Sequence, residues 1–251
     1  MKITSKDIFS IRKKIIQLSY SSKSAHLGSS LSCVEILYSL ILFLKNKKYK
    51  NSEIIMSKGH ASMAYLSCLE YFRFVKKINV NNYLKKNSEY WGHISRNKKN
   101  NYLKFSFGSL GCGLGIAAGI AYHNLHNKIY EPIFVVMSDG ELNEGSVFES
   151  AQFIAHHNLY NIKILIDSNK IQSFGRTKEI LNINYKKVFA SLNYITEEVN
   201  GHFANDILKK INKKRKHPLF LICNTIKGKG LKNTEDKLES HYYPASTDDL
   251  L

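Results

Sequence analysis

The chain has 251 residues, 43% of them hydrophobic, and a formal net charge of +17 at pH 7. This length and apolar content predict a single α/β domain over residues 1–251 with a full core. No apolar run reaches the roughly 18 residues of a membrane span, and residues 1–5 lack the apolar segment of a secretory signal. We therefore expect a cytoplasmic protein that does not bind a membrane. The basic residues are mostly lysines spread along the chain, which argues against nucleic acid as a partner.

The N-terminal part of the sequence predicts two helices separated by a polar loop. Apolar residues at helical spacing follow Ser5, which we expect to cap the first helix. The polar residues 24–31 read as a loop that contains one histidine. Ser32 and Glu35 have the spacing of a capping box, so they should open a second helix that runs to about Leu44.

The next segments contain histidines near strand ends and a glycine-rich stretch. Residues 54–56 form a short predicted strand that stops just before His60, and His93 lies in a later loop. Residues 107–115 (FGSLGCGLG) precede a helix of small residues that begins at Ile116. A dinucleotide-binding fingerprint would need a glycine at that position, so the stretch does not indicate a nicotinamide or flavin site.

Two strands in the middle of the chain predict the organising unit of the fold. Residues 133–137 and 162–166 are short β-rich apolar runs, and an amphipathic segment, 147–155, separates them. Such a βαβ unit places both strands parallel, with their carboxyl ends at one edge of the sheet. Asp139 follows the first strand and Asn169 follows the second, 30 residues later. Carboxylate and amide oxygens are ligands for Mg²⁺ or Ca²⁺, so we expect a metal site at this edge.

The C-terminal part continues the alternation of strands and helices. Residues 194–199 and 218–223 are predicted strands, and residues 204–211 are a predicted helix between them. This pattern predicts an α/β fold, a doubly wound and mostly parallel sheet flanked by helices. Lys227 comes shortly after the last strand, and His241 lies near the end of the chain.

Together these motifs resemble those of thiamine diphosphate-dependent enzymes. Residues 138–140 (SDG), followed by residues 167–169 (DSN), resemble the motif that holds the cofactor diphosphate and its metal. Residues 141–145 (ELNEG) resemble the transketolase version of this motif. The resemblance implies the thiamine diphosphate-binding fold and transfer of a two-carbon ketol unit from a ketose to an aldose. Three residues depart from the family's usual Gly, Pro and Trp, namely Ser138, Ile94 and Ser240.

The resemblance also implies the roles of individual residues. Side-chain oxygens of Asp139 and Asn169 and the carbonyl of Ile171 would hold Mg²⁺, for which Ca²⁺ or Mn²⁺ can substitute. Four histidines would hydrogen-bond the sugar and move protons, and Glu144 would link the two cofactors across a subunit interface. These implied catalytic residues are His26, His60, His93, His241 and Glu144. The implied cofactor-binding residues are His60, Gly108, Ser109, Leu110, Asp139, Gly140, Glu141, Asn169, Lys227 and His241.

In the family, a glutamate that activates the cofactor's aminopyrimidine ring lies in the domain that follows. This sequence reaches only Leu251. The resemblance therefore implies one subunit of a split transketolase, whose partner is a C-terminal subunit with the pyrimidine-binding domain. We expect an α2β2 assembly that acts on sugars or sugar phosphates.

Three alternatives remain open on the sequence alone. One is a subunit of another thiamine diphosphate enzyme, such as a decarboxylating synthase that forms a deoxyxylulose-type product. Another is a non-catalytic partner module that keeps the fold. The third is a basic nucleic-acid binder, which only the net charge supports. For His93 itself, packing against Trp91 is an alternative to a site role.

Overall fold

The structure is a computed structural model that describes residues 4–173 and 175–250. Its centre is a five-stranded sheet in the order β1-β2-β3-β5-β4, in which every strand pairs parallel to its neighbours. Strand β2 is buried along its whole length, as expected for a parallel sheet covered on both faces. The strands are β1 (Glu53–Met56), β2 (Ile133–Ser138), β3 (Ile162–Ser168), β4 (Ile195–Asn200) and β5 (Leu219–Asn224).

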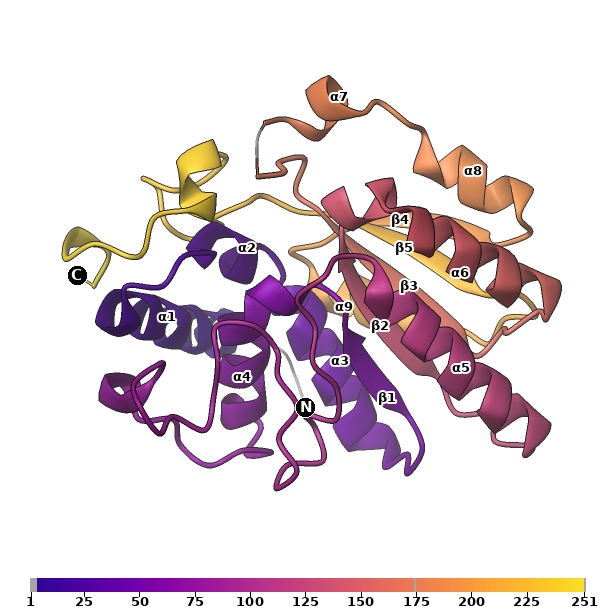
Figure 1. Cartoon of the computed structure of the whole chain (residues 1–251), viewed down its shortest axis with the longest axis horizontal. Helices are drawn as coiled ribbons and strands as arrows, with labels where there is room; N and C mark the ends of the chain where they lie inside the picture. Colours follow the sequence, from indigo (N-terminus) through magenta and orange to yellow (C-terminus); the bar gives the residue numbers. More distant parts are fainter. Residues whose placement is uncertain (1–3, 174, 251) are drawn as a thin grey trace.

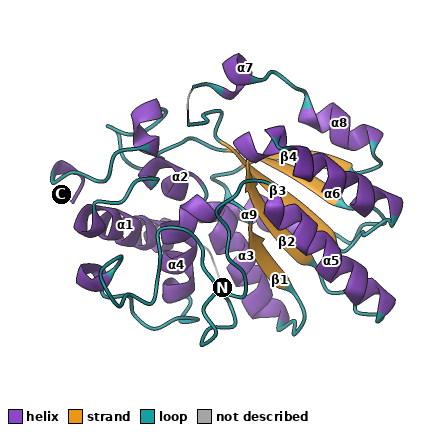
Figure 2. Ribbon diagram, in the orientation of Figure 1, coloured by secondary structure: helices purple, strands orange, loops and turns teal. Residues whose placement is uncertain are grey.

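Helices cover both faces of this sheet (Figures 1 and 2). On one face, Phe189 stacks on Phe220 of β5 with ring centroids 3.9 Å apart. On the other face, Phe43 meets Phe134 of β2 edge to face at 5.6 Å. The doubly wound architecture predicted from the sequence is therefore confirmed. The first face carries α5 (Cys112–His126), α6 (Gly145–His156) and α8 (Tyr185–Ser191), and the second carries α3 (Val34–Lys47) and α9 (Ala204–Asn212).

Further helices pack beside the sheet, away from α5 and α6. Helices α1 (Ser5–Ser22) and α4 (Ser62–Tyr71) pack against each other and against α3. Short elements lie near the carboxyl edge of the sheet, where loops converge (Figure 1). The remaining elements are α2 (Leu27–Ser32), α7 (Thr177–Ile180), η1 (Gly59–Ala61), η2 (Val80–Asn82), η3 (Gly140–Asn143), η4 (Leu238–His241) and η5 (Asp248–Leu250). In the described part of the chain, no helix has both the length and the apolar character needed to cross a bilayer.

Both predicted helix caps were wrong. Thr4, not Ser5, caps α1, because the Thr4 hydroxyl accepts a hydrogen bond from the Asp7 amide at 3.3 Å. Helix α3 has no side-chain cap, and its N-cap residue is Cys33. The two residues expected to form its capping box have tertiary partners instead. Ser32 Oγ donates to Asp167, and Glu35 accepts from Arg12.

The loop expected at residues 24–31 is also wrong in its second half. Helix α2 begins at Leu27, and all six of its residues are buried, including three serines. His26 precedes it with φ +67°, a left-handed conformation that turns the chain into the helix. Serine-rich composition suggested exposure, but these serines lie beneath the carboxyl edge of the sheet, where buried charges supply partners.

Candidate active site

A cavity of about 360 Å³, here called the histidine-lined cavity, lies at the carboxyl ends of the strands. It gathers segments that are far apart in the sequence, from the turn before α2 to η4 near the C-terminus. Two residues of the sequence-predicted set, Ser109 and Glu141, do not line it. The predicted residues that do line it are His26, His60, His93, Gly108, Leu110, Asp139, Gly140, Glu144, Asn169, Ile171, Lys227 and His241.

Four histidines from four separate segments form a cluster on one wall of this cavity. The ring of His26 is central, with centroids 5.3 Å from His60, 5.3 Å from His93 and 5.0 Å from His241. The backbone adds a tie, because the His26 amide donates to the His241 carbonyl at 2.9 Å. The rings are close enough for one small polar ligand to meet several of them.

The environment of the cluster keeps three of these rings neutral near pH 7. Burial, together with nearby positive charge, lowers the pKa of His26 to about 4 and that of His241 to about 3. Burial also holds the pKa of His60 well below its usual value. A neutral imidazole offers one donor and one acceptor, so these rings are suited to hydrogen-bonding hydroxyl groups. The expected proton transfer at neutral pH is less favoured by these low pKa values in the unliganded cavity.

A buried ion pair supports the floor of the cavity. Lys58, which lines the cavity, donates to a carboxylate oxygen of Asp167, and neither side chain is exposed to solvent. Lys58 also donates to the Ser29 carbonyl at 2.8 Å, while Ser32 and Thr225 hydroxyls donate to Asp167. Although burial acts against both charges, each one favours the charged form of the other, so the pKa of Lys58 is raised and that of Asp167 is lowered.

Sequence reasoning missed Lys58 as a site residue. It lies directly before the segment Gly59-His60-Ala61, at the end of β1. Its position at a strand end was a usable signal, but a lysine in a lysine-rich chain suggested a solvent-exposed side chain. The cavity lining also includes Ser29, Asn143, Gln172 and Ser173, which the sequence did not single out.

Oxygen atoms suitable for a metal ion face the same cavity. Asp139 Oδ2 accepts from the Lys170 amide at 2.7 Å, and Asp139 Oδ1 accepts from the Gly140 amide at 3.0 Å. Asn169 Oδ1 accepts from the Ile171 amide at 3.1 Å, and the Ile171 carbonyl is 3.4 Å from Lys227 Nζ. Each oxygen keeps a lone pair free for a further ligand.

The donor chemistry of this set fits a hard divalent cation. Among the described residues, no group of three or more His, Cys, Asp or Glu side chains is placed to hold a metal. The set here needs only one such residue, because its other oxygens come from an amide and a backbone carbonyl, both of which are ligands for Mg²⁺. Burial, followed by the charge of Asp167, raises the pKa of Asp139 to about 6. A carboxylate with this uncompensated charge would gain from a bound cation.

Glu141 has a structural position instead of a place in the cavity wall. Its carboxylate is fully buried and accepts from the Gly111 amide at 3.0 Å and from the Ser138 amide at 2.9 Å. It also accepts from the Ser57 hydroxyl at 2.5 Å, and the Ser138 hydroxyl donates to it at 3.3 Å. Glu141 thus ties the ends of β1 and β2 to the glycine-rich stretch. This network also accommodates serine at position 138, where the family usually has glycine.

The glycine-rich stretch packs tightly against β1 and η1. A Cβ atom at Gly113 would lie 2.4 Å from Cβ of Ser57, and one at Gly59 would lie 2.3 Å from the Phe107 carbonyl oxygen. Side chains at these positions would force the backbones apart. Within this stretch Ser109 is exposed and lies outside the cavity lining, whereas Gly108 and Leu110 line it.

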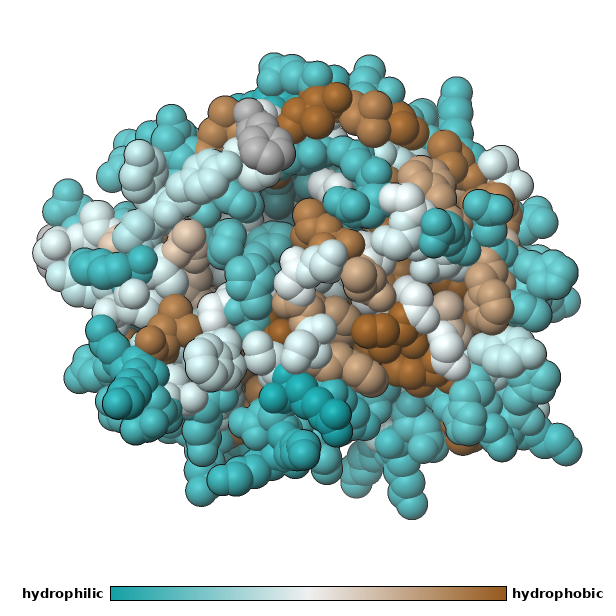
Figure 3. All heavy atoms as spheres, in the orientation of Figure 1, coloured by the Kyte–Doolittle hydropathy of each residue, from teal (hydrophilic) through white to brown (hydrophobic). Residues whose placement is uncertain are grey.

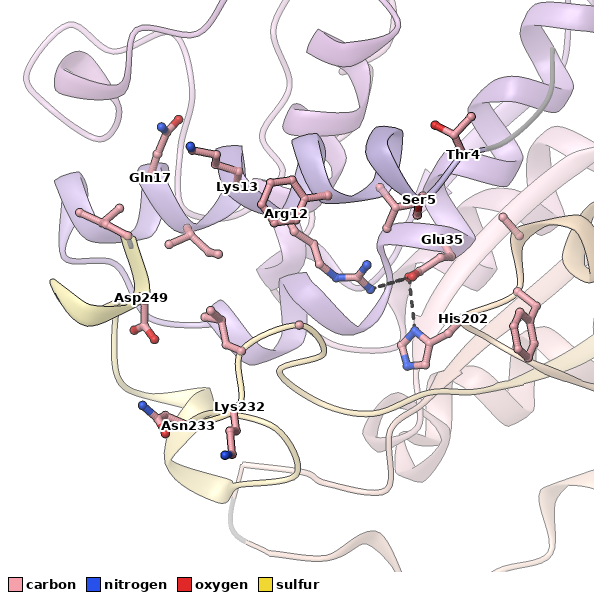
Figure 4. A pocket seen from close by; sticks show the side chains of 18 of the residues that line it. Thr4, Ser5, Arg12, Lys13, Gln17, Glu35, His202, Lys232, Asn233 and Asp249 are labelled. Carbon is pink, nitrogen blue, oxygen red and sulfur yellow. Dashed lines mark hydrogen bonds and ion pairs between the residues drawn. The ribbon is translucent and has the colours of Figure 1, made fainter.

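A larger cavity, of about 930 Å³ and here called the α1 cavity, lies between α1, α9 and residues 230–233 (Figure 4). Its floor is a closed polar network. Arg12 Nη2 lies 2.8 Å from both carboxylate oxygens of Glu35. His202 Nε2 accepts from the Ile226 amide at 2.9 Å, which leaves the proton on Nδ1, 3.3 Å from Glu35. None of the sequence-predicted site residues lines this cavity.

Comparisons with known proteins agree with the geometry of the histidine-lined cavity. Residues 4–251 match the family model described as "Transketolase, thiamine diphosphate binding domain". One of the two subunits of apulose-4-phosphate transketolase from Actinobacillus succinogenes is 33% identical over 251 residues, which covers 96% of this chain and 90% of that protein. Its namesake from Phocaeicola vulgatus is 29% identical over 241 residues, covering 92% and 85%.

Longer transketolases match over part of their length. Human transketolase is 29% identical over 244 residues, which covers 93% of this chain and 38% of that protein. Transketolase from Leishmania mexicana superposes with a TM-score of 0.87 at 20% identity, covering 100% of this chain and 40% of that chain. This chain therefore spans less than half the length of these longer proteins. It belongs to the transketolase thiamine diphosphate-binding domain family, as the resemblance of its motifs predicted.

Proposed function

We propose that this chain is the N-terminal subunit of a two-chain transketolase that uses thiamine diphosphate and Mg²⁺. One observation carries the proposal. A single cavity gathers the oxygen donors Asp139, Asn169 and Ile171 with four histidines, in a chain similar over most of its length to proteins named as transketolase subunits. Thiamine diphosphate, when bound, supplies the carbon nucleophile that accepts and releases the two-carbon unit.

The residues of the cavity would divide the work as follows. Asp139, Asn169 and the Ile171 carbonyl would hold Mg²⁺ against the diphosphate, and Gly140 leaves room for that anion. Lys227 lies 3.2 Å from Nδ1 of His241, so a cationic donor and an imidazole are available together on the same wall.

The neutral rings at positions 26, 60 and 241, together with His93, would orient the sugar by hydrogen bonds to its hydroxyl groups. Hydrogen bonds of this kind fix the reacting carbons relative to the cofactor, which is the protein's main contribution to such a reaction.

The proposal includes a partner chain with the pyrimidine-binding domain, in an α2β2 assembly. Helix α5 is apolar on its outer face as well as its inner one, with Ile116 and Ile120 half-buried and Gly119 open. Such a helix surface is usually covered by protein. Phe153 of α6, 41% exposed, extends the apolar area that Figure 3 shows in brown over these helices. Glu144 lines the cavity immediately before α6, where the partner would reach it.

The proposed substrates are sugar phosphates, in keeping with the names of the two apulose-4-phosphate transketolase relatives. We place the enzyme in the cytoplasm, a compartment suited to its four free cysteines.

The test needs the chain alone and the chain mixed with a candidate partner subunit. Calorimetry should detect thiamine diphosphate binding that depends on Mg²⁺ and disappears with EDTA. A coupled assay should detect ketol transfer from a ketose phosphate only when both chains are present. Strong ketol transfer by the chain alone would contradict the two-chain assignment, and CO₂ release from pyruvate by the mixture would identify a decarboxylating synthase instead.

A further inference from the structure

A further cavity, of about 820 Å³, adjoins the metal-ligand candidate Asp139 from the opposite side. It lies at the ends of β3, β5 and β4, beneath the segment that joins α7 to α8, which arches over the sheet in Figure 1. Of the residues that the structure describes, Asp139 is the one that lines both this cavity and the histidine-lined cavity. The two spaces therefore lie on either side of Asp139 and do not share the histidine cluster.

The charge of this cavity favours an anion. Lys170, Lys178, Lys186 and Lys187 line it, and among the described residues only Lys186 of these four forms an ion pair, with Glu198 at 2.8 Å. The carboxylate of Asp139 is turned to the Lys170 amide. The lining thus holds four lysines against two acidic residues, and lysine ammonium groups are frequent ligands of phosphate.

The rest of the lining is largely apolar. Leu142 and Ile166 are buried in its floor, and Leu181 and Ile183 at its mouth are 41% and 38% exposed. Exposed aliphatic side chains facing a basic cavity are suited to a ligand with an anionic end and an apolar body. The hydroxyls of Ser168 and Thr196 add polar groups that can orient such a ligand.

We propose that this cavity, here called the α7–α8 cavity, binds an organic phosphate as a second site beside the active site. The cavity wall also includes the groups that hold Asp139. Both Lys170, whose amide donates to Asp139 Oδ2 at 2.7 Å, and Thr177, whose hydroxyl lies 3.3 Å from the same oxygen, line it. A ligand that contacts these groups changes the orientation of Asp139, and this coupling rests on the proposed metal-binding function. By linkage, the cofactor then changes the affinity for the organic phosphate by the same factor.

Calorimetry on the purified chain, without metal or thiamine diphosphate, tests the binding itself. The probes are phenyl phosphate, inorganic phosphate and phenol, which separate the anionic and apolar parts. Phenyl phosphate should bind about ten-fold more tightly than either of the others, because it meets the lysines and the apolar wall together. Equal affinities for phenyl phosphate and inorganic phosphate would overturn the proposal.

A matched pair of double variants locates the site. Lys178→Ala with Lys187→Ala removes two exposed lysines of the α7–α8 cavity, and Lys76→Ala with Lys77→Ala removes two exposed lysines outside it. The first variant should bind phenyl phosphate about ten-fold more weakly, whereas the second should change affinity by less than about two-fold. Circular dichroism checks that both remain folded. Equal affinities in the two variants would exclude the α7–α8 cavity.

The coupling to Asp139 has its own readout. Saturating phenyl phosphate should change the Mg²⁺-dependent affinity for thiamine diphosphate by about five-fold, and Thr177→Val should reduce that change. Complete displacement of phenyl phosphate by thiamine diphosphate would show that the probe occupies the histidine-lined cavity, and would overturn the second site. If phenyl phosphate binds with the expected lysine dependence but thiamine diphosphate does not bind at all, the proposed function fails and the cavity assignment stands.

Discussion

The histidine-lined cavity and the α1 cavity differ in how their buried charges are compensated. The α1 cavity is the larger, at about 930 Å³ against about 360 Å³, but its Arg12 and Glu35 satisfy each other and His202 completes the network (Figure 4). In the histidine-lined cavity, Asp139 forms no ion pair with any described residue, and its pKa is raised to about 6. Volume alone would select the α1 cavity, whereas uncompensated charge selects the histidine-lined cavity.

The two networks also differ in what they connect. Arg12, Glu35 and His202 tie α1 and α3 to the loop before α9, and Arg12 Nε adds a bond to the Lys229 carbonyl at 2.9 Å. This arrangement stabilises the packing of helices. The Lys58–Asp167 pair instead supports the floor on which the oxygen donors lie. We therefore expect substitutions in the α1 cavity to change stability, and substitutions at Asp139 to change ligand binding.

The largest expected effect is on cofactor binding. Asp139→Asn should weaken Mg²⁺-dependent binding of thiamine diphosphate by about 100-fold or more, because it removes the only anionic ligand of the proposed metal set. Glu35→Gln in the α1 cavity is the matched control and should change this affinity by less than about three-fold. Calorimetry on both variants measures the contrast, and similar losses in the two would remove the functional distinction between the cavities.

The next effect is on stability, at the ion pair beneath the histidine-lined cavity. Lys58→Met should lower the free energy of unfolding by about 3–5 kcal/mol, because Asp167 would remain buried and charged without a cation. Replacing both residues, as Lys58→Met with Asp167→Leu, should recover a large part of this loss. Urea denaturation gives both values. A single variant as stable as the parent would show that solvent reaches Asp167.

A smaller loss is expected in the α1 cavity. Arg12→Ala should cost about 2 kcal/mol, less than Lys58→Met, because Glu35 keeps its hydrogen bond from His202 and both side chains of the pair are partly exposed. The same denaturation experiment measures it. A cost above that of Lys58→Met would reverse the order of burial that the two networks show.

The sequence was informative where periodicity and strand ends determine the structure. The apolar runs before Asp139 and Asn169 became β2 and β3, and their parallel register explains why both oxygen donors reach one cavity. The family motif then assigned the histidines, whose clustering from four segments no local pattern could predict.

The sequence was misleading where polar residues are buried. Ser29 and Ser32 suggested a loop, yet they belong to helix α2 and hydrogen-bond the buried pair of Lys58 and Asp167. Burial of this kind depends on partners more than 100 residues away, since Ser32 and Asp167 are 135 residues apart. Local composition cannot report such contacts, and the same limit applies to Glu35 at the start of α3.

The smallest effect tests whether uncompensated charge alone indicates a ligand site. Lys163, near the amino end of β3, donates to the Ile211 carbonyl, and burial, followed by the charges of Arg215 and Lys47, lowers its pKa to about 8. Its usual value is 10.5, so the folded state binds this proton less tightly than the unfolded state does. The resulting destabilisation is complete below pH 8 and fades as the pH rises toward 10.5.

Lys163→Met should therefore stabilise the protein at pH 7 by about 1 kcal/mol, and the gain should vanish near about pH 10. Urea denaturation at the two pH values measures it. Cofactor binding should stay unchanged, because Lys163 lies at the end of the sheet away from both the metal-ligand candidates and the histidines. A loss of thiamine diphosphate affinity in this variant would mean that a buried, uncompensated charge without an adjoining cavity also affects the site, and the contrast between the two cavities would then need a different physical basis.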